Sequence, residues 1–343
     1  MEIGILGLPL SGKSTLFEIM TALRSRDVHG EVCVRGQATV PDERFEHLVK
    51  IFQPLKVSPA KVPFVDVNAV GERAWDALRQ NLSGADGFVQ VVDGFSVDRV
   101  EEVIKRYQQM EDELIISDLQ IVENRLERME KTSKKGLSPQ DVAQAQILPL
   151  LKEQLDRGKP LRELGLTAEE VHSLRSFSFW SIRPELVVVN TAEGNPGMAD
   201  AFKELVAPQT PVLGICCLTE AELAGLSREE QKEFLADLGI EEPAFGRIIR
   251  AAFSLLGRIA YFTCGADEVK SWVIPACSKA PKAAAAIHKD FERGFIKAEV
   301  VSYADFQLFG SAFAAAKAAG KMRLEGKEYI VQDGDIITFR FNV

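Results

Sequence analysis

The sequence predicts an α/β fold in which strands and helices alternate, interrupted by a helical arm and followed by a small α+β unit. Three observations support this prediction. Short apolar runs alternate with helical stretches, one long segment repeats apolar residues at helical spacing, and a glycine-rich loop directly follows the first run. With 343 residues, the chain is long enough for about two or three domains.

Five apolar runs have the length and the β-branched content of buried parallel strands. A helical stretch, Ser14–Leu23, follows the first of them. Because helices that alternate with parallel strands cover both faces of the sheet, the pattern predicts an open α/β sheet. The five runs are Ile3–Leu6, Val62–Val65, Phe88–Val92, Leu186–Val189 and Val212–Cys217.

A different pattern occupies residues 98–182, between the third and fourth runs. Apolar residues recur there at alternating spacings of four and three, with charged residues between them, and a second apolar helix follows the turn KKGLSP. We expect two antiparallel helices that form a coiled-coil arm, although an ordinary helical hairpin packed on the main body fits equally well. The first seam comprises Ile115, Leu119, Val122, Leu126 and Met129, and the second Ile147, Leu148, Leu151 and Leu155.

Residues 280–343 predict a third, α+β segment. It combines a strand, Phe295–Ser302, an Ala-rich helix near Ser311–Ala319 and a hairpin over EYIVQDGDIITFRF that turns at Asp333-Gly334. The remaining segments, 1–97 and 183–279, are then expected to form the domain that carries the five-stranded sheet.

Composition limits the classes of function. The net charge of −9 argues against nucleic-acid binding over the whole surface, but the segment from Lys279 onward holds ten Lys and Arg against eight Asp and Glu, so a local contact with RNA or phosphate is possible beside ordinary surface charge. No apolar run is long enough to span a membrane, and no basic leader precedes the first strand. Five cysteines without metal-ligand spacing fit a reducing compartment. We therefore expect a soluble, cytoplasmic protein.

The loop GLPLSGKST carries the strongest functional signal. Gly7, Gly12, Lys13 and Ser14 satisfy the pattern GxxxxGKS, directly after a strand and at the start of a helix. The glycines allow backbone N–H groups to surround a polyphosphate, Lys13 reaches the terminal phosphates, and the Ser14 hydroxyl can bind Mg²⁺. The loop predicts a nucleoside-triphosphate site.

Besides the Ser14 hydroxyl, the metal needs a carboxylate at the end of a neighbouring strand, which holds it through water. Asp66 ends the run VPFVD and fits this role. In nucleotide switch proteins the carboxylate begins a DxxG motif followed by a water-orienting Gln, whereas here Asp66 begins DVNA and the next residue is Val70. Val70 cannot polarise water, so we expect hydrolysis to recruit its water in another way.

Base recognition is expected at the strand that ends in Asn190. Guanine-specific proteins carry NKxD there, and this chain has Asn190, Thr191, Ala192 and Glu193. The Lys stem that stacks on the base is missing, and the longer Glu193 places its carboxylate differently. Discrimination in favour of guanine should therefore fall by about 10²-fold. Cys216, at the end of the next strand, is expected to contribute van der Waals and backbone contacts rather than nucleophilic chemistry.

Together, these motifs resemble the YchF or Obg-like ATPase family over essentially the whole chain. The residues that carry the resemblance are GLPLSGKSTLF, the NxxE form of the base motif, EAELAGLSREEQKEFLADLGI, and the C-terminal IHKDFERGFIKAEVVSY and KMRLEGKEYIVQDGDIITFRFNV. The resemblance implies a Ras-like P-loop G domain, an inserted coiled-coil arm and a β-grasp (TGS) domain. It also implies a preference for ATP over GTP, an association with ribosomes, and a part in translation and stress responses.

Carried to this sequence, the resemblance implies phosphate binding by residues 10–15, Mg²⁺ at Ser14 and adenine contact through Asn190 and Thr191. The phosphate-binding residues are Leu10, Ser11, Gly12, Lys13, Ser14 and Thr15. The chain departs from the family in three places. Leu10-Ser11 replaces Asn-Val, HGEVCVRGQA contains no Thr, and DVNAVGERA replaces DIAGLVKGA. The prediction is an ATP-preferring P-loop protein with slow hydrolysis; a non-hydrolysing nucleotide-dependent scaffold and a GTP-binding protein are the alternatives.

Overall fold

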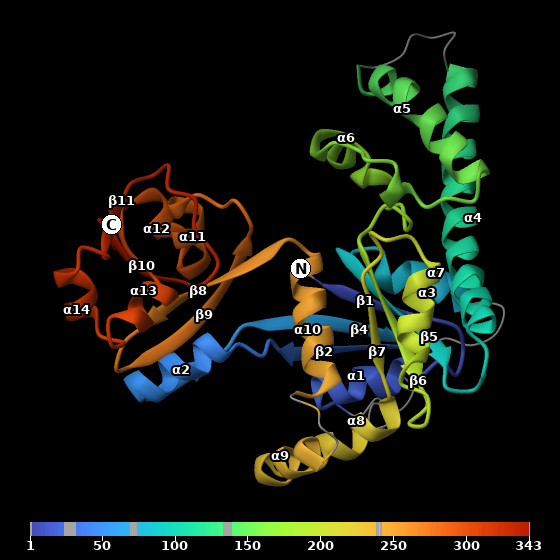
Figure 1. The fold of residues 1–343 in the computed structure, drawn as a ribbon. Helices are drawn as coiled ribbons and strands as arrows, with labels where there is room; N and C mark the ends of the chain where they lie inside the picture. Colours follow the sequence, from blue (N-terminus) through green and yellow to red (C-terminus); the bar gives the residue numbers. More distant parts are fainter. Residues whose placement is uncertain are drawn as a thin grey trace. The chain divides into compact units, whose positions relative to one another are not determined.

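The computed structural model describes residues 2–23, 32–68, 74–132, 139–237, 240 and 242–342. The chain forms two compact units, each with its own six-stranded sheet (Figure 1). The first unit contains residues 1–36 and 63–248, and the second contains residues 37–62 and 249–343.

The sheet of the first unit has the strand order β2-β4-β1-β5-β6-β7. β1 pairs in parallel with β4 and β5, and β6 pairs in parallel with β5 and β7, which confirms the predicted open α/β sheet. Four of these strands are mostly buried because they are rich in Val, Ile, Leu and Phe. The strands are β1 (Ile3–Leu6), β2 (Cys33–Thr39), β4 (Lys61–Val67), β5 (Gly87–Gly94), β6 (Glu185–Thr191) and β7 (Val212–Ile215).

Helices cover this sheet through two apolar clusters. One contains Leu6, Phe88 and Trp180, and the other contains Val189 and Phe202. The helices that begin in this unit are α1 (Lys13–Thr21), α3 (Ala74–Leu82), α4 (Val100–Thr132), α5 (Pro139–Asp156), α6 (Ala168–Ser173), α7 (Met198–Leu205), α8 (Cys217–Ala224), α9 (Arg228–Asp237) and α10 (Ala244–Leu255), with short 3₁₀ turns at Leu161–Glu163 and Arg175–Phe177. Of these, α5 and α6 lie in the helical insertion, and α10 continues into the second unit.

The helical insertion is built from α4 and α5. Both predicted seams lie in one apolar cluster, in which Val122, Leu148 and Leu151 are fully buried. Midway along α4, the buried Asp118 accepts hydrogen bonds from the backbone N–H groups of Trp180 and Ser181. The insertion is thereby fixed to the segment that leads into β6.

The second unit has the sheet order β11-β10-β12-β8-β9-β3. β8 and β9 form an antiparallel hairpin, a helix follows, and the last strand, β12, lies between β8, which it pairs in parallel, and the antiparallel β10. This is the β-grasp arrangement. Its elements are α2 (Glu43–Phe52), β3 (Lys56–Ser58), β8 (Arg258–Cys264), β9 (Glu268–Pro275), α11 (Ala280–Ile287), α12 (Lys289–Arg293), β10 (Phe295–Ser302), α13 (Tyr303–Leu308), α14 (Phe313–Ala318), β11 (Arg323–Glu325) and β12 (Asp335–Phe341).

Two sequence expectations for this unit differ from the structure. The predicted boundary at residue 280 falls inside the β-grasp sheet, because the β8–β9 hairpin supplies three of its strand pairings. The predicted hairpin over residues 328–341 is wrong. β12 already has neighbours on both edges, so no edge is free for the preceding segment, and Ile330 instead makes an isolated bridge to Lys279.

Candidate nucleotide-binding site

The glycine-rich loop connects the end of β1 to the start of α1, as the sequence predicts. Gly7 and Gly12 have φ angles of 148° and 98°, which side-chain-bearing residues rarely adopt. Space is also lacking at both positions, because an added Cβ would lie 2.4 Å from the Val91 carbonyl oxygen at Gly7 and 2.4 Å from Asn190 Nδ2 at Gly12. Only glycine allows this backbone to lie so close to its neighbours.

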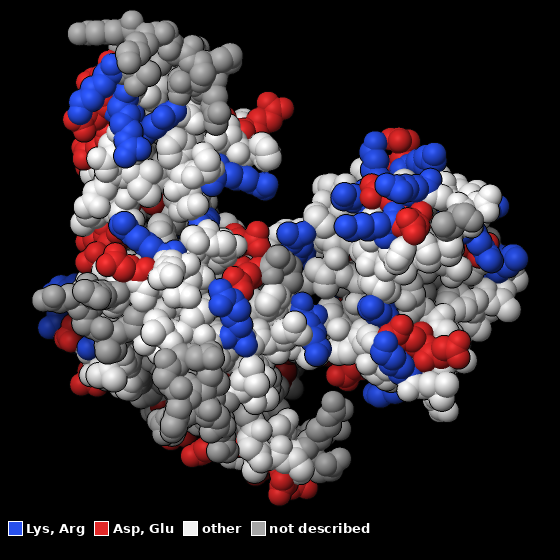
Figure 2. Space-filling view, turned by 180° about the vertical axis from the view of Figure 1, so that it is seen from behind, with Lys and Arg blue, Asp and Glu red and all other residues white. Residues whose placement is uncertain are grey.

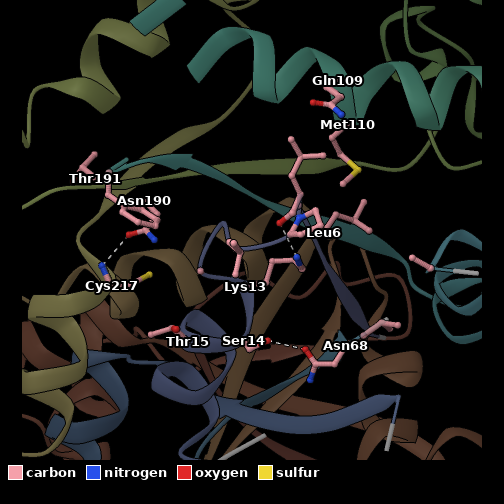
Figure 3. Close-up of a pocket in the computed structure, with 18 of the residues that line it drawn as sticks. Leu6, Lys13, Ser14, Thr15, Asn68, Gln109, Met110, Asn190, Thr191 and Cys217 are labelled. Carbon is pink, nitrogen blue, oxygen red and sulfur yellow. Dashed lines mark hydrogen bonds between the residues drawn. The ribbon is translucent and has the colours of Figure 1, made fainter. Parts of the chain in front are cut away.

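Parallel pairing brings the other predicted residues to the same edge of the sheet. The carboxyl ends of β4, β6 and β7 carry Asp66, Asn190 and Cys216, on either side of the loop. A cavity of about 960 Å³ opens there (Figure 3). Its lining includes ten of the predicted residues: Gly7, Leu10, Gly12, Lys13, Ser14, Thr15, Asn190, Thr191, Glu193 and Cys216.

Lys13 lies at the first position of α1, facing the loop. Its Nζ donates a hydrogen bond to the Leu8 carbonyl oxygen at 2.9 Å. Burial lowers the pKa of Lys13 below its ordinary value, and the negative charge of Asp66 opposes this change. A phosphate oxygen that replaced the Leu8 carbonyl would offer the ammonium group a full opposite charge.

Ser14 lines the cavity, whereas Asp66 lies behind the lining near the end of the neighbouring strand β4. Asp66 is fully buried, and neither of its carboxylate oxygens accepts a hydrogen bond from a residue within the described ranges. Burial raises the pKa of this carboxyl, and the positive charge of Lys13 opposes the rise. A buried carboxylate without a partner is costly, so the site suits a cation or its bound water.

Asn190 connects the loop to the neighbouring strand end. Its Nδ2 donates to the Ser11 carbonyl oxygen at 3.1 Å, and its Oδ1 accepts from the Cys217 backbone N–H at 3.1 Å. Asn190 is 4% exposed. The amide therefore serves the architecture of the loop, whatever it contributes to a base.

The remaining predicted base residues are partly committed to protein contacts. The Thr191 hydroxyl donates to the Ile215 carbonyl oxygen at 3.3 Å, which directs it into the sheet. Glu193 Oε1 accepts from the Thr219 hydroxyl at 3.0 Å. Cys216 precedes α8 and contacts the same hydroxyl through its sulfur. Among the described residues that line this end of the cavity, none is a Lys or Arg whose stem could stack on a base as the Lys of a guanine site does.

Leu10 and Ser11 occupy opposite environments. Leu10 is 90% exposed and has a φ of 65°, an unfavourable backbone conformation for a branched side chain. Ser11 is buried under the loop, behind the cavity lining. Val70 lies outside the described residues.

The structure also shows lining residues that the sequence did not indicate. Asn68 accepts a hydrogen bond from the Ser14 hydroxyl at 2.8 Å, although nothing in DVNA distinguishes it from a loop residue. An apolar wall comes from α3, α4 and the end of β5: Trp75, Leu78, Met110 and Phe95. These residues lie far apart in sequence, so only the fold brings them together.

Within the described residues, no group of three His, Cys, Asp or Glu side chains could hold a metal ion by itself. No helix there combines the length and the apolar character needed to cross a membrane.

Comparisons with known proteins agree with this fold. Residues 258–342 match the family model YchF-GTPase_C, described as a protein of unknown function, and the match starts at the first residue of β8. The chain is 37% identical over 361 residues to "Ribosome-binding ATPase YchF" of Haemophilus influenzae and 37% identical over 363 residues to the protein of that name from Bacillus subtilis, each alignment covering 99% of both chains. It is 32% identical over 369 residues to "Obg-like ATPase 1" of Oryza sativa subsp. japonica, covering all of this chain and 92% of that one.

A solved structure is similar as well. The "Structure of the Schizosaccharomyces pombe YchF GTPase" superimposes with a TM-score of 0.85 at 27% identity, over 99% of this chain and 97% of the other.

Proposed function

The chain belongs to the family of YchF and Obg-like ATPases, and on that basis we propose that it binds ATP in preference to GTP and hydrolyses it slowly. One observation carries the proposal. A single cavity is lined both by Gly12, Lys13 and Ser14 of the phosphate loop and by Asn190 and Glu193 of the predicted base segment, as a nucleoside triphosphate requires.

The phosphate end supports binding of a magnesium nucleotide. Lys13 neutralises charge on the terminal phosphates, and the loop glycines expose backbone N–H groups to them. The unpartnered Asp66 carboxylate and the Ser14 hydroxyl fit Mg²⁺, which prefers few protein oxygens and keeps several waters. The ion would neutralise phosphate charge that develops during hydrolysis.

The base end supports adenine over guanine. Guanine recognition needs a free carboxylate that accepts hydrogen bonds from N1–H and the exocyclic amine, yet Glu193 already accepts from Thr219. The missing stacking stem at Thr191 weakens the site for guanine further. Loss of such a paired contact costs about 10²-fold in discrimination.

Slow hydrolysis follows from the absence of a water-orienting side chain. Val70, where a Gln is expected in switch proteins, has no polar atom with which to orient water. Lys13 and the backbone after Asp66 remain to stabilise charge and place the attacking water.

The proposal is tested by titration with ATP and GTP, together with single-turnover hydrolysis. We expect ATP to bind at least about tenfold more tightly than GTP, and Lys13→Ala to lose both binding and hydrolysis. Lys203→Ala, which removes an exposed lysine from α7, is the matched control. Tighter binding of GTP than of ATP would contradict the adenine argument.

A nucleotide-dependent scaffold without hydrolysis is the second candidate. It is favoured by the way residues 37–62, which connect β2 to β4, are fixed within the second unit. There Arg44 binds Asp42 at 2.8 Å and Asp333 at 2.7 Å. Single-turnover hydrolysis that persists in wild type and disappears in Lys13→Ala would exclude the scaffold.

Association with ribosomes is the proposed cellular context, in the cytoplasm, because the bacterial relatives are named ribosome-binding ATPases. The second unit offers basic side chains for contact with RNA, with acidic ones interspersed on the face seen in Figure 2. Lys282, Lys289 and Arg293 are exposed on α11 and α12. Reversing these three charges should weaken co-sedimentation with ribosomes and reduce its salt dependence. Unchanged co-sedimentation would point to the helical arm instead.

A further inference from the structure

The hydroxyl of Ser14 and the side chain of Asn68 form a contact at the metal end of the cavity. Ser14 Oγ donates to Asn68 Oδ1 at 2.8 Å (Figure 3). Ser14 lies in the first turn of α1, and Asn68 directly follows β4. The Asn68 backbone is held as well, because its N–H donates to the Val32 carbonyl oxygen at 2.8 Å. Both partners therefore project from fixed backbone.

The direction of this hydrogen bond determines what Ser14 can offer a cation. A serine hydroxyl has one proton and two acceptor lone pairs. An asparagine carbonyl oxygen can only accept, so the proton must lie on the Asn68 side. Both lone pairs of Ser14 Oγ then remain available for an electrophile in the cavity.

The neighbouring Asp66 carboxylate is the other group that could accept the Ser14 hydroxyl proton. It lies two residues before Asn68, is fully buried, and accepts no hydrogen bond from any described residue. If Asp66 accepted the hydrogen bond from Ser14, one of its carboxylate oxygens would be less available to a cation. Because Asn68 takes that proton instead, both carboxylate oxygens stay free for a cation or for water bound to it.

We propose that Asn68 is a positioning residue for the divalent cation, holding the Ser14 hydroxyl so that its lone pairs face the metal while Asp66 remains unpaired. The proposal rests on the proposed function, since it assumes a magnesium nucleotide at this loop. It also explains how a chain that lacks Thr in HGEVCVRGQA can order its metal ligands. An alanine, as in the DIAG sequence of the family, could not accept the proton.

The test compares nucleotide affinity with and without Mg²⁺. ATP and ADP are titrated into the full chain in Mg²⁺ and in EDTA, and the ratio of the two Kd values measures the coupling between metal and nucleotide. We expect Asn68→Ala to reduce this ratio by about three- to tenfold, the effect of one net hydrogen bond, with the Kd in EDTA unchanged. Asn68→Asp keeps an acceptor in place and should retain the coupling.

Two further measurements separate positioning from a merely structural role. Mn²⁺ in the nucleotide complex should give an altered electron paramagnetic resonance spectrum in Asn68→Ala but not in Asn81→Ala, which removes an amide from α3 outside the cavity lining. A Kd that rises equally in Mg²⁺ and EDTA would show that Asn68 only shapes the loop, and would overturn the inference.

The outcomes also separate this inference from the proposed function. Normal ATP binding with equal coupling in wild type and Asn68→Ala would contradict the positioning role alone. Absence of ATP binding by the wild-type chain would overturn both.

Discussion

Asn190 holds Ser11 in place through a buried hydrogen bond of 3.1 Å from its Nδ2 to the Ser11 carbonyl oxygen. The same amide accepts from the Cys217 backbone N–H, so it joins the phosphate loop to the start of α8. We expect Asn190→Ala to weaken ATP and GTP binding together by about tenfold or more, because two buried hydrogen bonds that shape the loop are lost.

The measurement is a pair of titrations, with Asn195→Ala, outside the cavity lining, as the control. A change in the ATP-to-GTP ratio without a common loss of affinity would show that Asn190 acts mainly on the base.

The backbone conformation of Leu10 predicts that replacing this residue with Asn will stabilise the folded chain. Its φ of 65° costs a branched residue about 1–2 kcal/mol, whereas Asn adopts this conformation more readily. Leu10→Asn should therefore raise the free energy of unfolding by about 1 kcal/mol in urea denaturation. Leu205→Asn also removes an exposed leucine, but from a helix, and should bring no gain. Equal effects of the two variants would contradict the strain argument.

In the seam of the helical insertion, alanine substitutions at two adjacent positions of α5 should have very different effects on stability. Leu151 is fully buried against α4, and Leu150 is 55% exposed. Leu151→Ala should destabilise the insertion by about 2–5 kcal/mol because it leaves a cavity, while Leu150→Ala should stay within about 0.5 kcal/mol of wild type. Amide hydrogen exchange in α4 reports this local stability directly. Similar exchange in the two variants would show that the seam is not the source of helix pairing.

A buried ionic cluster predicts a dependence of stability on pH. Arg162 binds both Glu111 and Glu185, and burial, followed by the charge of Glu185, raises the pKa of Glu111 to about 8. The folded chain therefore binds this proton more tightly than the unfolded chain does. The stabilisation is present at acidic pH and is lost as the pH rises through about 8.

Unfolding free energies between about pH 5 and 8 should fall by on the order of 2 kcal/mol in wild type. Glu111→Gln should flatten that profile, because its side chain does not titrate. Glu113→Gln removes an exposed carboxylate from the same helix and should leave the slope intact. A slope that persists in Glu111→Gln would assign the pH dependence to other groups.

The sequence predicted those parts of the fold that depend on local pattern. The run Ile3–Leu6 gave the observed bounds of β1, because a short apolar segment before a glycine-rich loop has few other conformations. Phe295–Ser302 likewise gave the bounds of β10. Strand pairing was harder to predict, since the residues before Asp333-Gly334 look like a hairpin arm until both edges of β12 are known to be occupied.

The same distinction applies to the site. The phosphate loop was predictable because its residues are consecutive. Asn68 was not, since its significance arises from a hydrogen bond to Ser14, 54 residues away. Asn190 was predicted as a base residue, but its hydrogen bond to the loop depends on the pairing of β1 with β5 and of β5 with β6.

Two distant segments of the chain form the second unit, and this affects how the protein folds during synthesis. Phe45 and Leu48 of α2 are buried in one cluster with Phe262, Phe306 and Ile336. Arg44 and its partner Asp333 are 289 residues apart. At elongation rates of about 5–20 residues per second, the residues that bury the apolar face of α2 are synthesised on the order of tens of seconds after α2 itself. The nascent chain thus exposes a hydrophobic helix early, and a ribosome that stalls before β8 would leave that helix open to aggregation or to chaperones.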